Sequence, residues 1–318
     1  MLTGILAEEI ARRGPISFHE FQHTALYHPE HGYYRRERDP FGARGDFYTA
    51  EQLQPVFGLL MARTVERLHG RMPARFEVVE LGAGREEMRS YFERWSYQAI
   101  ESGRGQLPAE IHGLVFGNEF LDALPVHLVR KKRGHFHEVS VAGYEGKFQY
   151  VEGPCVKGKL AEYLAKHGQH VPDGGLVEAH LDAVQWLDRL SAAVKQGFVL
   201  FIDYGFTERE RVRFPQGTLM SYWRHQADED VLCKPGERDI TSHVPFTMLI
   251  DEAKERGFFV ERYESLAQLL LDAGEPDQFA NVLESQNEQE AARRRGQLKT
   301  LLYGMGETFR VLLLSRGV

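Results

Sequence analysis

The sequence has few cysteines and no long apolar segment. Only two cysteines, Cys155 and Cys233, occur among its 318 residues, too few for a disulfide framework or a cysteine-rich zinc cluster. We therefore expect a reducing compartment and a cytoplasmic location. Because no apolar run approaches the length of a membrane span, we expect no insertion into a membrane.

The first residues also lack the pattern of a targeting segment. The stretch MLTGILAEEIARRG has neither the apolar core nor the cleavage site of a signal peptide. Glu8 and Glu9 make it more acidic than a mitochondrial presequence. Its apolar residues recur at the spacing of one helix face, so we expect a short amphipathic helix.

A basic field is absent as well. The formal net charge is -7, which argues against nucleic acid as the main partner, because phosphate binding needs concentrated positive charge. With 42% hydrophobic and 27% charged residues, the composition is that of an ordinary globular protein. The length suits one large α/β domain with additions, or two domains.

The periodicity changes near residue 70. Before it, helical segments alternate with loops, and Ser17 followed by Glu20 has the pattern of a helix N-cap. After it, short apolar runs alternate with helical segments, which predicts a parallel sheet with crossover helices. Residues 127–153 alternate like an antiparallel hairpin, which we expect on the flank of that sheet. The strands expected from the apolar runs cover 76–81, 97–101, a segment ending at Asn118, 197–206 and part of 307–318.

The segment EVVELGAGREEMRSYF predicts a strand, a glycine turn and a helix. Such a unit binds a nucleotide-like cofactor beyond the carboxyl end of its strand. Gly82 and Gly84 are present, but the third glycine of a dinucleotide fingerprint is absent. Acids lie on both sides of the turn, at Glu80 and, in the first turn of the expected helix, at Glu86 and Glu87. They would repel a diphosphate, so the pattern favours S-adenosylmethionine, a cation without phosphate; a turn without any ligand is the alternative.

Two further segments supply polar residues at strand ends. Glu101 lies 19 residues after Gly82 (101 minus 82), where a carboxylate commonly binds the ribose of adenosine. In NEFLDALPV, Asn118 and Glu119 close a strand, so that Asn118 could bridge cofactor and substrate. Glu119 could hold a guanidinium or take a proton. These two residues and Asp122 are our candidate catalytic residues, and capping of the strand end and the next helix is the alternative role.

Taken in order, several blocks resemble the MidA family of S-adenosylmethionine-dependent methyltransferases. The mitochondrial relatives in that family are arginine methyltransferases that assist the assembly of respiratory complex I. The resemblance extends from residue 15 to the end of the chain. The blocks are PISFHEFQHTALYHPEHGYY, GDFYTAEQLQPVFGLLMA, ELGAGR, NEFLDALPV, FIDYGF, GTLMSYWRHQADEDVLCKPGERDITSHVPFTML and MGETFRVLLLSRG.

The resemblance implies a class I methyltransferase fold, a Rossmann-like and mostly parallel sheet with an antiparallel last strand. It implies an N-terminal helical extension at 1–70, and a methyltransferase domain at 71–318 with insertions at about 130–175 and 207–245. The implied cofactor site includes Gly45, Asp46, Gly82, Gly84 and Asn118. The residues implied to lie on the substrate side are Tyr222, His225, Asp239, Thr241 and His243. The two histidines lack a third ligand at suitable spacing, so we expect no metal site.

The chain departs from the family pattern E-L-G-P-G-R-G at Ala83 and Glu86, and it is shorter between the glycine turn and NEF. Residues 97–101 could therefore be the third strand of the family, which would bring Glu101 near the adenine instead of the ribose. The shortening also leaves a degenerate cofactor site open.

Three functions remain to be separated. The first is a protein methyltransferase that acts on a nitrogen, most simply of arginine, in a protein such as a respiratory complex subunit. The second is a non-catalytic binding or assembly protein with the same fold. The third is a dinucleotide-dependent oxidoreductase, against which the missing glycine and the acids count. The sequence leaves the oligomeric state open, and a homodimer through the hairpin or the last helices is one arrangement that it allows.

Overall fold

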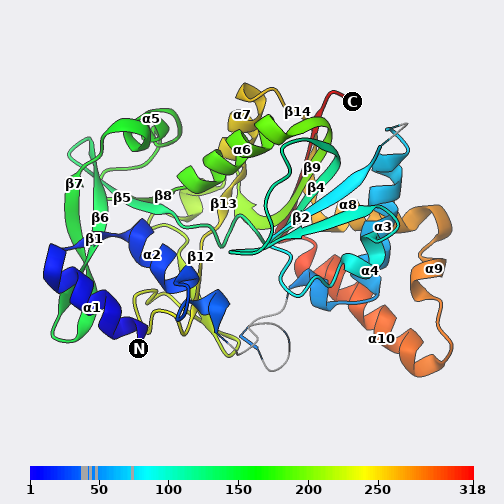
Figure 1. The fold of residues 1–318 in the computed structure, drawn as a ribbon, viewed down its shortest axis with the longest axis horizontal. Coiled ribbons are helices and arrows are strands. Elements are labelled where there is room, and N and C mark those ends of the chain that lie inside the picture. Colours follow the sequence, from blue (N-terminus) through cyan, green and yellow to red (C-terminus); the bar gives the residue numbers. More distant parts are fainter. Residues whose placement is uncertain (37–41, 43–44, 47–48, 73–74) are drawn as a thin grey trace. The chain divides into compact units, whose positions relative to one another are not determined.

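The computed structural model describes residues 1–36, 42, 45–46, 49–72 and 75–318, and these fall into two compact units (Figure 1). Each unit is discontinuous in sequence. Unit 1 comprises Met1–Tyr48, Asp122–Gln185 and Phe206–Met248, and unit 2 comprises Thr49–Leu121, Trp186–Gly205 and Leu249–Val318. The expected extension and insertions overlap the segments of unit 1, and their boundaries stay a prediction.

Unit 2 is built on a mostly parallel sheet. Its strands are β2 (Glu77–Leu81), β3 (Ser96–Ile100), β4 (Ile111–Asn118), β9 (Val194–Phe206), β14 (Phe259–Ser265) and β15 (Phe309–Arg316). Along the sheet they follow the order β14-β15-β9-β4-β2-β3. The pairs β3–β2, β2–β4 and β4–β9 are parallel, whereas β15 is antiparallel to both β9 and β14. The expected parallel sheet with an antiparallel last strand is therefore confirmed.

The sequence of β2 explains its central place. All five residues of EVVEL are buried, which is typical of a parallel strand covered on both faces. The neighbouring strand β4 approaches β2 closely at Gly113, where φ is +151° and an added Cβ would lie 2.0 Å from the carbonyl oxygen of Glu77. Only glycine fits at that point, so Gly113 helps to fix the register of the two strands.

Helices and short helical turns pack around this sheet. They are η2 (Ala50–Gln52), α3 (Val56–His69), α4 (Arg89–Phe92), α8 (Leu266–Gly274), η4 (Glu275–Asp277), α9 (Ala280–Leu283), α10 (Glu288–Lys299) and the π-helix η5 (Thr300–Met305). Buried apolar side chains of α3 and α8, among them Phe57, Leu60 and Leu270, form one core with the strand residues Phe116 and Leu200. α6 (Leu181–Ala193) and α7 (Phe246–Glu255) belong partly to each unit.

Unit 1 contains two antiparallel sheets with helices against them. Its elements are α1 (Leu2–Arg13), β1 (Ile16–Ser17), α2 (Phe18–Tyr27), η1 (Tyr33–Arg35), β5 (His127–Lys132), β6 (His135–Tyr144), β7 (Lys147–Cys155), α5 (Gly158–His167), β8 (Leu176–Ala179), η3 (Arg211–Arg213), β10 (Met220–Trp223), β11 (Gln226–Asp228), β12 (Asp239–Thr241) and β13 (Val244–Pro245). One sheet has the order β1-β6-β5-β8 with β7 beside β6, and the other the order β11-β10-β12. Leu6, Phe18 and Phe21 bury α1 and α2 against the first sheet.

Two local expectations can be compared with unit 1. The helix N-cap at Ser17 is confirmed, since its hydroxyl accepts a hydrogen bond from the backbone N–H of Glu20. The hairpin expected on the flank of the parallel sheet is wrong in its placement. Residues 127–153 are antiparallel, but β5, β6 and β7 join β1 and β8 in a sheet of their own, because each has antiparallel partners within unit 1.

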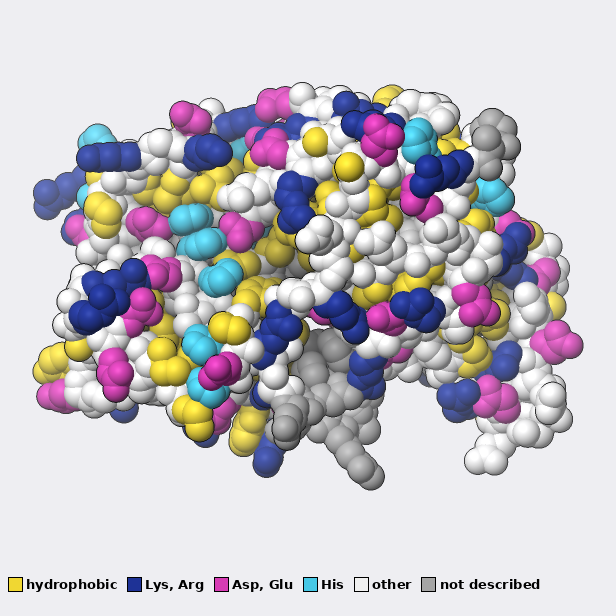
Figure 2. Space-filling view, viewed as in Figure 1, with side chains coloured by type: hydrophobic (Ala, Val, Ile, Leu, Met, Phe, Trp, Pro, Cys, Tyr) yellow, Lys and Arg dark blue, Asp and Glu magenta, His cyan; other side chains and the backbone are white. Residues whose placement is uncertain are grey.

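The described part of the chain holds no helix that is both long enough and apolar enough to cross a membrane. On the face drawn in Figure 2, basic and acidic side chains are interspersed. The same mixture is seen in the many ion pairs between nearby residues, such as Arg94 with Glu66 and Lys132 with Glu152.

Candidate functional site

The glycine turn lies at the carboxyl end of β2. Gly82 has a φ of 67° and Gly84 a φ of 49°, values that favour glycine. The backbone N–H of Gly82 donates to the carbonyl of Ile100 at 2.9 Å, which ties the turn to the end of β3. The expected glycine turn is therefore present at the edge where α/β sheets bind ligands.

The long helix expected directly after the turn is wrong. Residues 85–88 form turns, Glu86 has a left-handed φ of 60°, and only the four residues of α4 are helical. Glu86 and Glu87 thus precede the helix instead of lying in its first turn, so a helix dipole does not account for them. Glu86 is paired with Arg89 and, at 3.1 Å, with Arg104.

Glu101 follows the last residue of β3, which pairs in parallel with β2. It therefore ends the strand next to the glycine-turn strand, which is the position where a ribose carboxylate is expected. Its carboxylate accepts the backbone N–H of Gly84 at 2.9 Å and that of Ser102 at 2.7 Å. β3 thus pairs directly with the glycine-turn strand, and the choice between ribose and adenine for Glu101 stays a prediction.

Glu80 is buried in β2, two residues before Gly82. Its Oε2 accepts the hydroxyl of Tyr97 at 2.5 Å, and its Oε1 has no hydrogen-bond partner among the described residues. Burial, together with the nearby charges of Glu87, Glu86 and Glu101, raises the pKa of Glu80 to about 8, against the effect of the Tyr97 hydrogen bond.

A further carboxylate, that of Glu51, was not among the residues predicted from sequence. It lies in η2 with 6% of its surface exposed. Burial and the neighbouring charges of Glu80, Glu87 and Glu119 raise its pKa well above the ordinary value, while a hydrogen bond from Asn118 acts in the opposite direction. Its position within the block GDFYTAEQLQPVFGLLMA was the one available signal.

These four side chains, Glu51, Glu80, Glu87 and Glu119, form what we call the carboxylate cluster. Such a concentration of acids at a glycine turn would repel a diphosphate and attract a cation. The buried Oδ1 of Asn118 and Oε1 of Glu80, both without hydrogen-bond partners in the described chain, are acceptors that an ammonium-bearing ligand would satisfy. The residues present therefore fit S-adenosylmethionine.

Asn118 ends β4, and the backbone of Glu119 has a left-handed φ of 51°. The Oε1 of Glu119 accepts the backbone N–H of Ala50 at 3.1 Å and the Asn118 side-chain amide at 3.3 Å. Asp203 in β9 supports the same loop, because its Oδ2 accepts the N–H of Leu121 at 2.9 Å. A non-glycine residue held in this conformation is strained, as is frequent at functional sites.

The remaining predicted residues lie in unit 1, where Asp46 organises one group. Its carboxylate accepts the Tyr33 hydroxyl at 3.0 Å and the backbone N–H of Arg224 at 2.9 Å, and it pairs with Arg36. Although burial opposes it, these bonds hold the pKa of Asp46 below its ordinary value. The carbonyl of Asp46 accepts the N–H of His225 at 2.8 Å, so Asp46 fixes the turn between β10 and β11. The neighbouring Gly45 donates its N–H to Gly42.

Asp239 is the centre of a second group in unit 1. Its Oδ1 accepts the Tyr34 hydroxyl at 3.0 Å, and burial followed by the charge of Asp122 raises its pKa to about 7. Tyr222 lies opposite Asp239 in the β10–β12 pair, and Thr241 ends β12. His243 donates its backbone N–H to the Thr218 hydroxyl at 2.9 Å. The unit boundary falls between Leu121 and Asp122, so Asp122 lies in the other unit from Asn118 and Glu119.

No group of three or more His, Cys, Asp or Glu residues in the described part of the chain is arranged to hold a metal ion. The chemistry available at the carboxylate cluster is therefore cation binding, hydrogen bonding and proton transfer by carboxylates.

Comparison with known proteins gives a consistent result. A family model described as "Putative S-adenosyl-L-methionine-dependent methyltransferase" matches residues 86–263, more than half of the chain. The chain is similar to a Drosophila melanogaster protein named "Protein arginine methyltransferase NDUFAF7 homolog, mitochondrial", with 25% identity covering 98% of this chain and 84% of that protein. It is also similar to mouse (Mus musculus) "Protein arginine methyltransferase NDUFAF7, mitochondrial", with 26% identity covering 77% and 67% of the two chains.

A solved structure supports the fold over the whole chain. It is a COG1565 superfamily member from Burkholderia thailandensis bound to S-adenosyl-homocysteine, 30% identical, with a TM-score of 0.86 and coverage of 100% of this chain and 92% of that one. The class I methyltransferase fold implied by the resemblance is confirmed, and a methyltransferase is supported over a non-catalytic binding protein.

The expected cytoplasmic location is wrong by the same comparisons, since both curated relatives carry mitochondrial names. The expectation rested on the cysteine count, and cysteine usage reports the redox state of a compartment without identifying the compartment.

Proposed function

Because this chain belongs to the family of S-adenosylmethionine-dependent methyltransferases, we propose that it methylates an arginine nitrogen of a protein substrate. The names of the curated relatives support the substrate class. The observation that carries the proposal is the carboxylate cluster, which includes Glu119 and adjoins Asn118 where β2 and β4 end. Both S-adenosylmethionine and the guanidinium of arginine are cations, and carboxylates recognise both.

The residues that would hold the cofactor come from the glycine turn and its surroundings. Gly82 and Gly84 allow a close backbone approach, and Glu80 and Glu51 supply carboxyl groups whose charged form a bound cation favours. The predicted role of Glu101 is to accept from the ribose hydroxyls. When bound, S-adenosylmethionine supplies an electrophilic methyl group on a sulfonium. The Oδ1 of Asn118, buried without a partner among the described residues, adds an acceptor beside these carboxylates.

Glu119 is the residue that we assign to the substrate. Its carboxylate can accept two hydrogen bonds from a guanidinium and so orient one nitrogen for in-line attack, which is the main source of acceleration in such a transfer. The carboxylate can also take the proton released on methylation. Its strained backbone and its hydrogen bonds to Ala50 and Asn118 hold it in one direction.

The other predicted roles remain part of the proposal. Asp122 as a third catalytic residue, Gly45 and Asp46 as cofactor residues, and a substrate side with Tyr222, His225, Asp239, Thr241 and His243 rest on the resemblance. A respiratory complex subunit as the substrate, and a homodimer, are finer statements of the same kind.

The test is methyl transfer from labelled S-adenosylmethionine to matched peptides that carry either arginine or lysine. We expect transfer to arginine, and a decrease in kcat of roughly 100-fold in Glu119→Gln, because the charge that orients and deprotonates the guanidinium is lost. The exposed Glu110 supplies the control, since it directly precedes β4 and Glu110→Gln removes a carboxylate from the same unit at the end of that strand opposite to Asn118 and Glu119. Equal labelling of both peptides, or unchanged turnover in Glu119→Gln, would contradict the proposal.

A further inference from the structure

The helix α10 buries little apolar surface. Its sequence is EQEAARRRGQLK, and none of its twelve residues, all of which the structure describes, is buried. Leu298 near its end packs, partly buried, against the core of unit 2, whereas the rest of the helix is mostly polar, so polar contacts contribute much of its position. The contacts of α10 therefore show what it is attached to.

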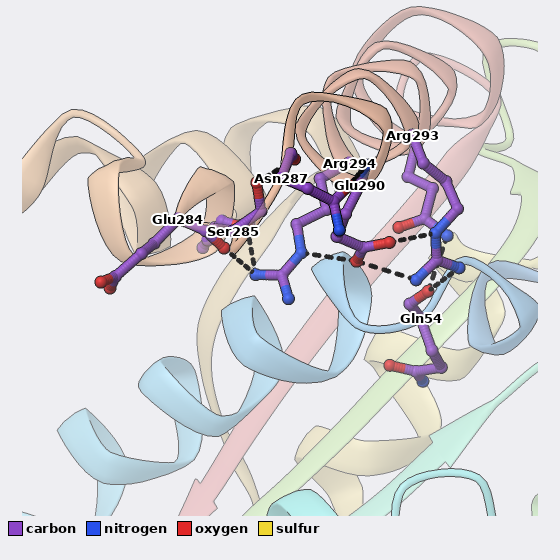
Figure 3. Close-up of polar contacts among 9 residues, drawn as sticks. Gln54, Glu284, Ser285, Asn287, Glu290, Arg293 and Arg294 are labelled. Carbon is purple, nitrogen blue, oxygen red and sulfur yellow. Dashed lines mark hydrogen bonds and ion pairs between the residues drawn. The ribbon is translucent and has the colours of Figure 1, made fainter.

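Within α10, the carboxylate of Glu290 accepts hydrogen bonds from two arginines, Arg293 and Arg294 (Figure 3). The side chain of Asn287 caps the helix by accepting the N–H of Glu290 at 2.9 Å. Glu290 accepts two hydrogen bonds from Arg293, at 2.8 and 2.9 Å, and one from Arg294 at 2.9 Å. Arg294 then donates to backbone carbonyls at the end of α9, including that of Glu284. The bonds to Glu290 therefore orient the guanidinium groups of Arg293 and Arg294, which also contact residues outside α10.

A further polar attachment of α10 is the backbone of Gln54. Arg293 Nη1 and Gln297 Nε2 donate to the Gln54 carbonyl at 3.3 and 2.6 Å, and Figure 3 shows the Arg293 side chain extending toward Gln54. The side chain of Gln54 makes two more contacts. Its Oε1 accepts the N–H of Gly58 in α3 at 3.0 Å, and its Nε2 lies 3.5 Å from the sulfur of Met88. Gln54 therefore connects α10 with α3 and with the segment after the glycine turn.

Two residues of the carboxylate cluster lie close in sequence to Gln54 and to its contact Met88. Glu51 lies in the single turn of η2, three residues before Gln54. Glu87 directly precedes Met88. One turn of 3₁₀ helix has little stability of its own. Burial and three neighbouring carboxylates oppose the charged form of Glu51. The position of Glu51 therefore depends on contacts that hold η2 and the residues after it. One is the hydrogen bond from Ala50 to Glu119, and another is the pair of hydrogen bonds to the Gln54 carbonyl.

We propose that α10 is a positioning element for the cofactor site, in which Arg293 and Gln297 hold the Gln54 carbonyl and thereby keep Glu51 directed into the carboxylate cluster. The two side chains touch neither cofactor nor substrate and act through the backbone between Glu51 and Gln54. This inference rests on the proposed placement of S-adenosylmethionine at the cluster.

The experiment measures the affinity of the full chain for S-adenosyl-homocysteine by titration calorimetry. In the double variant Arg293→Ala/Gln297→Ala we expect the Kd to rise about three- to tenfold, the size expected for the loss of one or two hydrogen bonds. Arg295→Ala is the matched control, because Arg295 lies on the same helix and pairs with Glu288. It should leave the Kd unchanged. Gln297→Asn, which keeps a donor on a shorter side chain, should recover part of the affinity.

A double-mutant cycle separates positioning from general loosening of the fold. Glu51→Gln should itself weaken binding, and in that background the Arg293→Ala/Gln297→Ala pair should cause little further loss, since the carboxyl group that the pair positions is no longer present. An equal loss in both backgrounds, or an unchanged Kd in the double variant, would overturn the role of α10. If instead Glu51→Gln binds as tightly as the parent chain, the placement of the cofactor itself fails, which is a different result.

Discussion

At the residue scale, the carboxyl group of Glu80 makes stability depend on pH. Its pKa is about 8 in the folded chain, compared with an ordinary value of 4.5, with burial as the main cause. Between these values the folded state holds a proton that the unfolded state has released, so this contribution to stability is complete below about pH 4.5 and is lost as the pH rises through about 8.

We therefore expect the free energy of unfolding to fall more steeply from pH 5 to pH 8 in the parent chain than in Glu80→Gln, by at most about 1.4 kcal/mol per pH unit. Glutamine keeps an acceptor for the Tyr97 hydroxyl but binds no proton. Urea unfolding across this range measures the difference. Parallel slopes for the two proteins would show that Glu80 ionises normally, and Glu110→Gln serves as the exposed control.

Gly82 gives a second prediction at this scale. Its φ of +67° disfavours any side chain, and an added Cβ would lie 3.0 Å from Cδ2 of Phe120. Gly82→Ala should therefore lower the free energy of unfolding by about 1–2 kcal/mol and also weaken cofactor binding. Gly4 in α1 has no atom within 4 Å of such a Cβ, so Gly4→Ala should be neutral or stabilising. Equal effects of the two substitutions on chemical denaturation would contradict this account.

Individual residues differed in how far the sequence revealed them. Gly82, Glu80 and Asn118 were recognisable because each lies at the carboxyl end of an apolar run that predicts a strand. The carboxyl ends of parallel strands meet at the same edge of the sheet. Glu51 was not recognisable in this way. It reaches the cluster from η2, a different part of the chain, and tertiary contacts alone determine its burial beside the other carboxylates.

At the scale of elements, α10 provides a test of local stability. Gly296 lies within this helix, and an added Cβ would meet no atom within 4 Å. Gly296→Ala should stabilise α10 by up to about 1 kcal/mol, because alanine loses less backbone entropy in a helix. Hydrogen exchange of the α10 amides should slow, and cofactor affinity should stay equal or increase. Faster exchange would mean that Gly296 is needed for another reason.

The elements also show where pattern reasoning fails. The strands β2 and β9 were predictable, because continuous apolar runs mark buried parallel strands. A helix was predicted directly after the glycine turn, yet only the four residues of α4 are helical there. Gly84 and Glu86 have left-handed backbone conformations, which are not helical, so the helix begins only at Arg89. Backbone conformation at a non-glycine residue such as Glu86 leaves no composition signal.

For the whole molecule, the positions of the tryptophans allow the binding of a ligand to be assigned to one of the two units. Of the three tryptophans, Trp95 and Trp186 lie in unit 2 and Trp223 lies in unit 1. In the variant Trp223→Phe, tryptophan fluorescence therefore reports on unit 2 alone. This makes thermal unfolding a readout of the unit that contains the carboxylate cluster.

We expect S-adenosyl-homocysteine at about 100 times its Kd to raise the midpoint of this transition by roughly 5–10 °C, since such occupancy stabilises the folded state by about 2.7 kcal/mol. NADH at the same concentration should give no shift, because its diphosphate would face the carboxylates of Glu51, Glu80 and Glu87. A shift with NADH, or no shift with S-adenosyl-homocysteine, would contradict the electrostatic argument. Repeating the titration in Glu80→Gln connects the result to the site: its shift should be smaller at the same ligand concentration, because the ammonium group of S-adenosyl-homocysteine favours the charged form of Glu80 and glutamine cannot ionise.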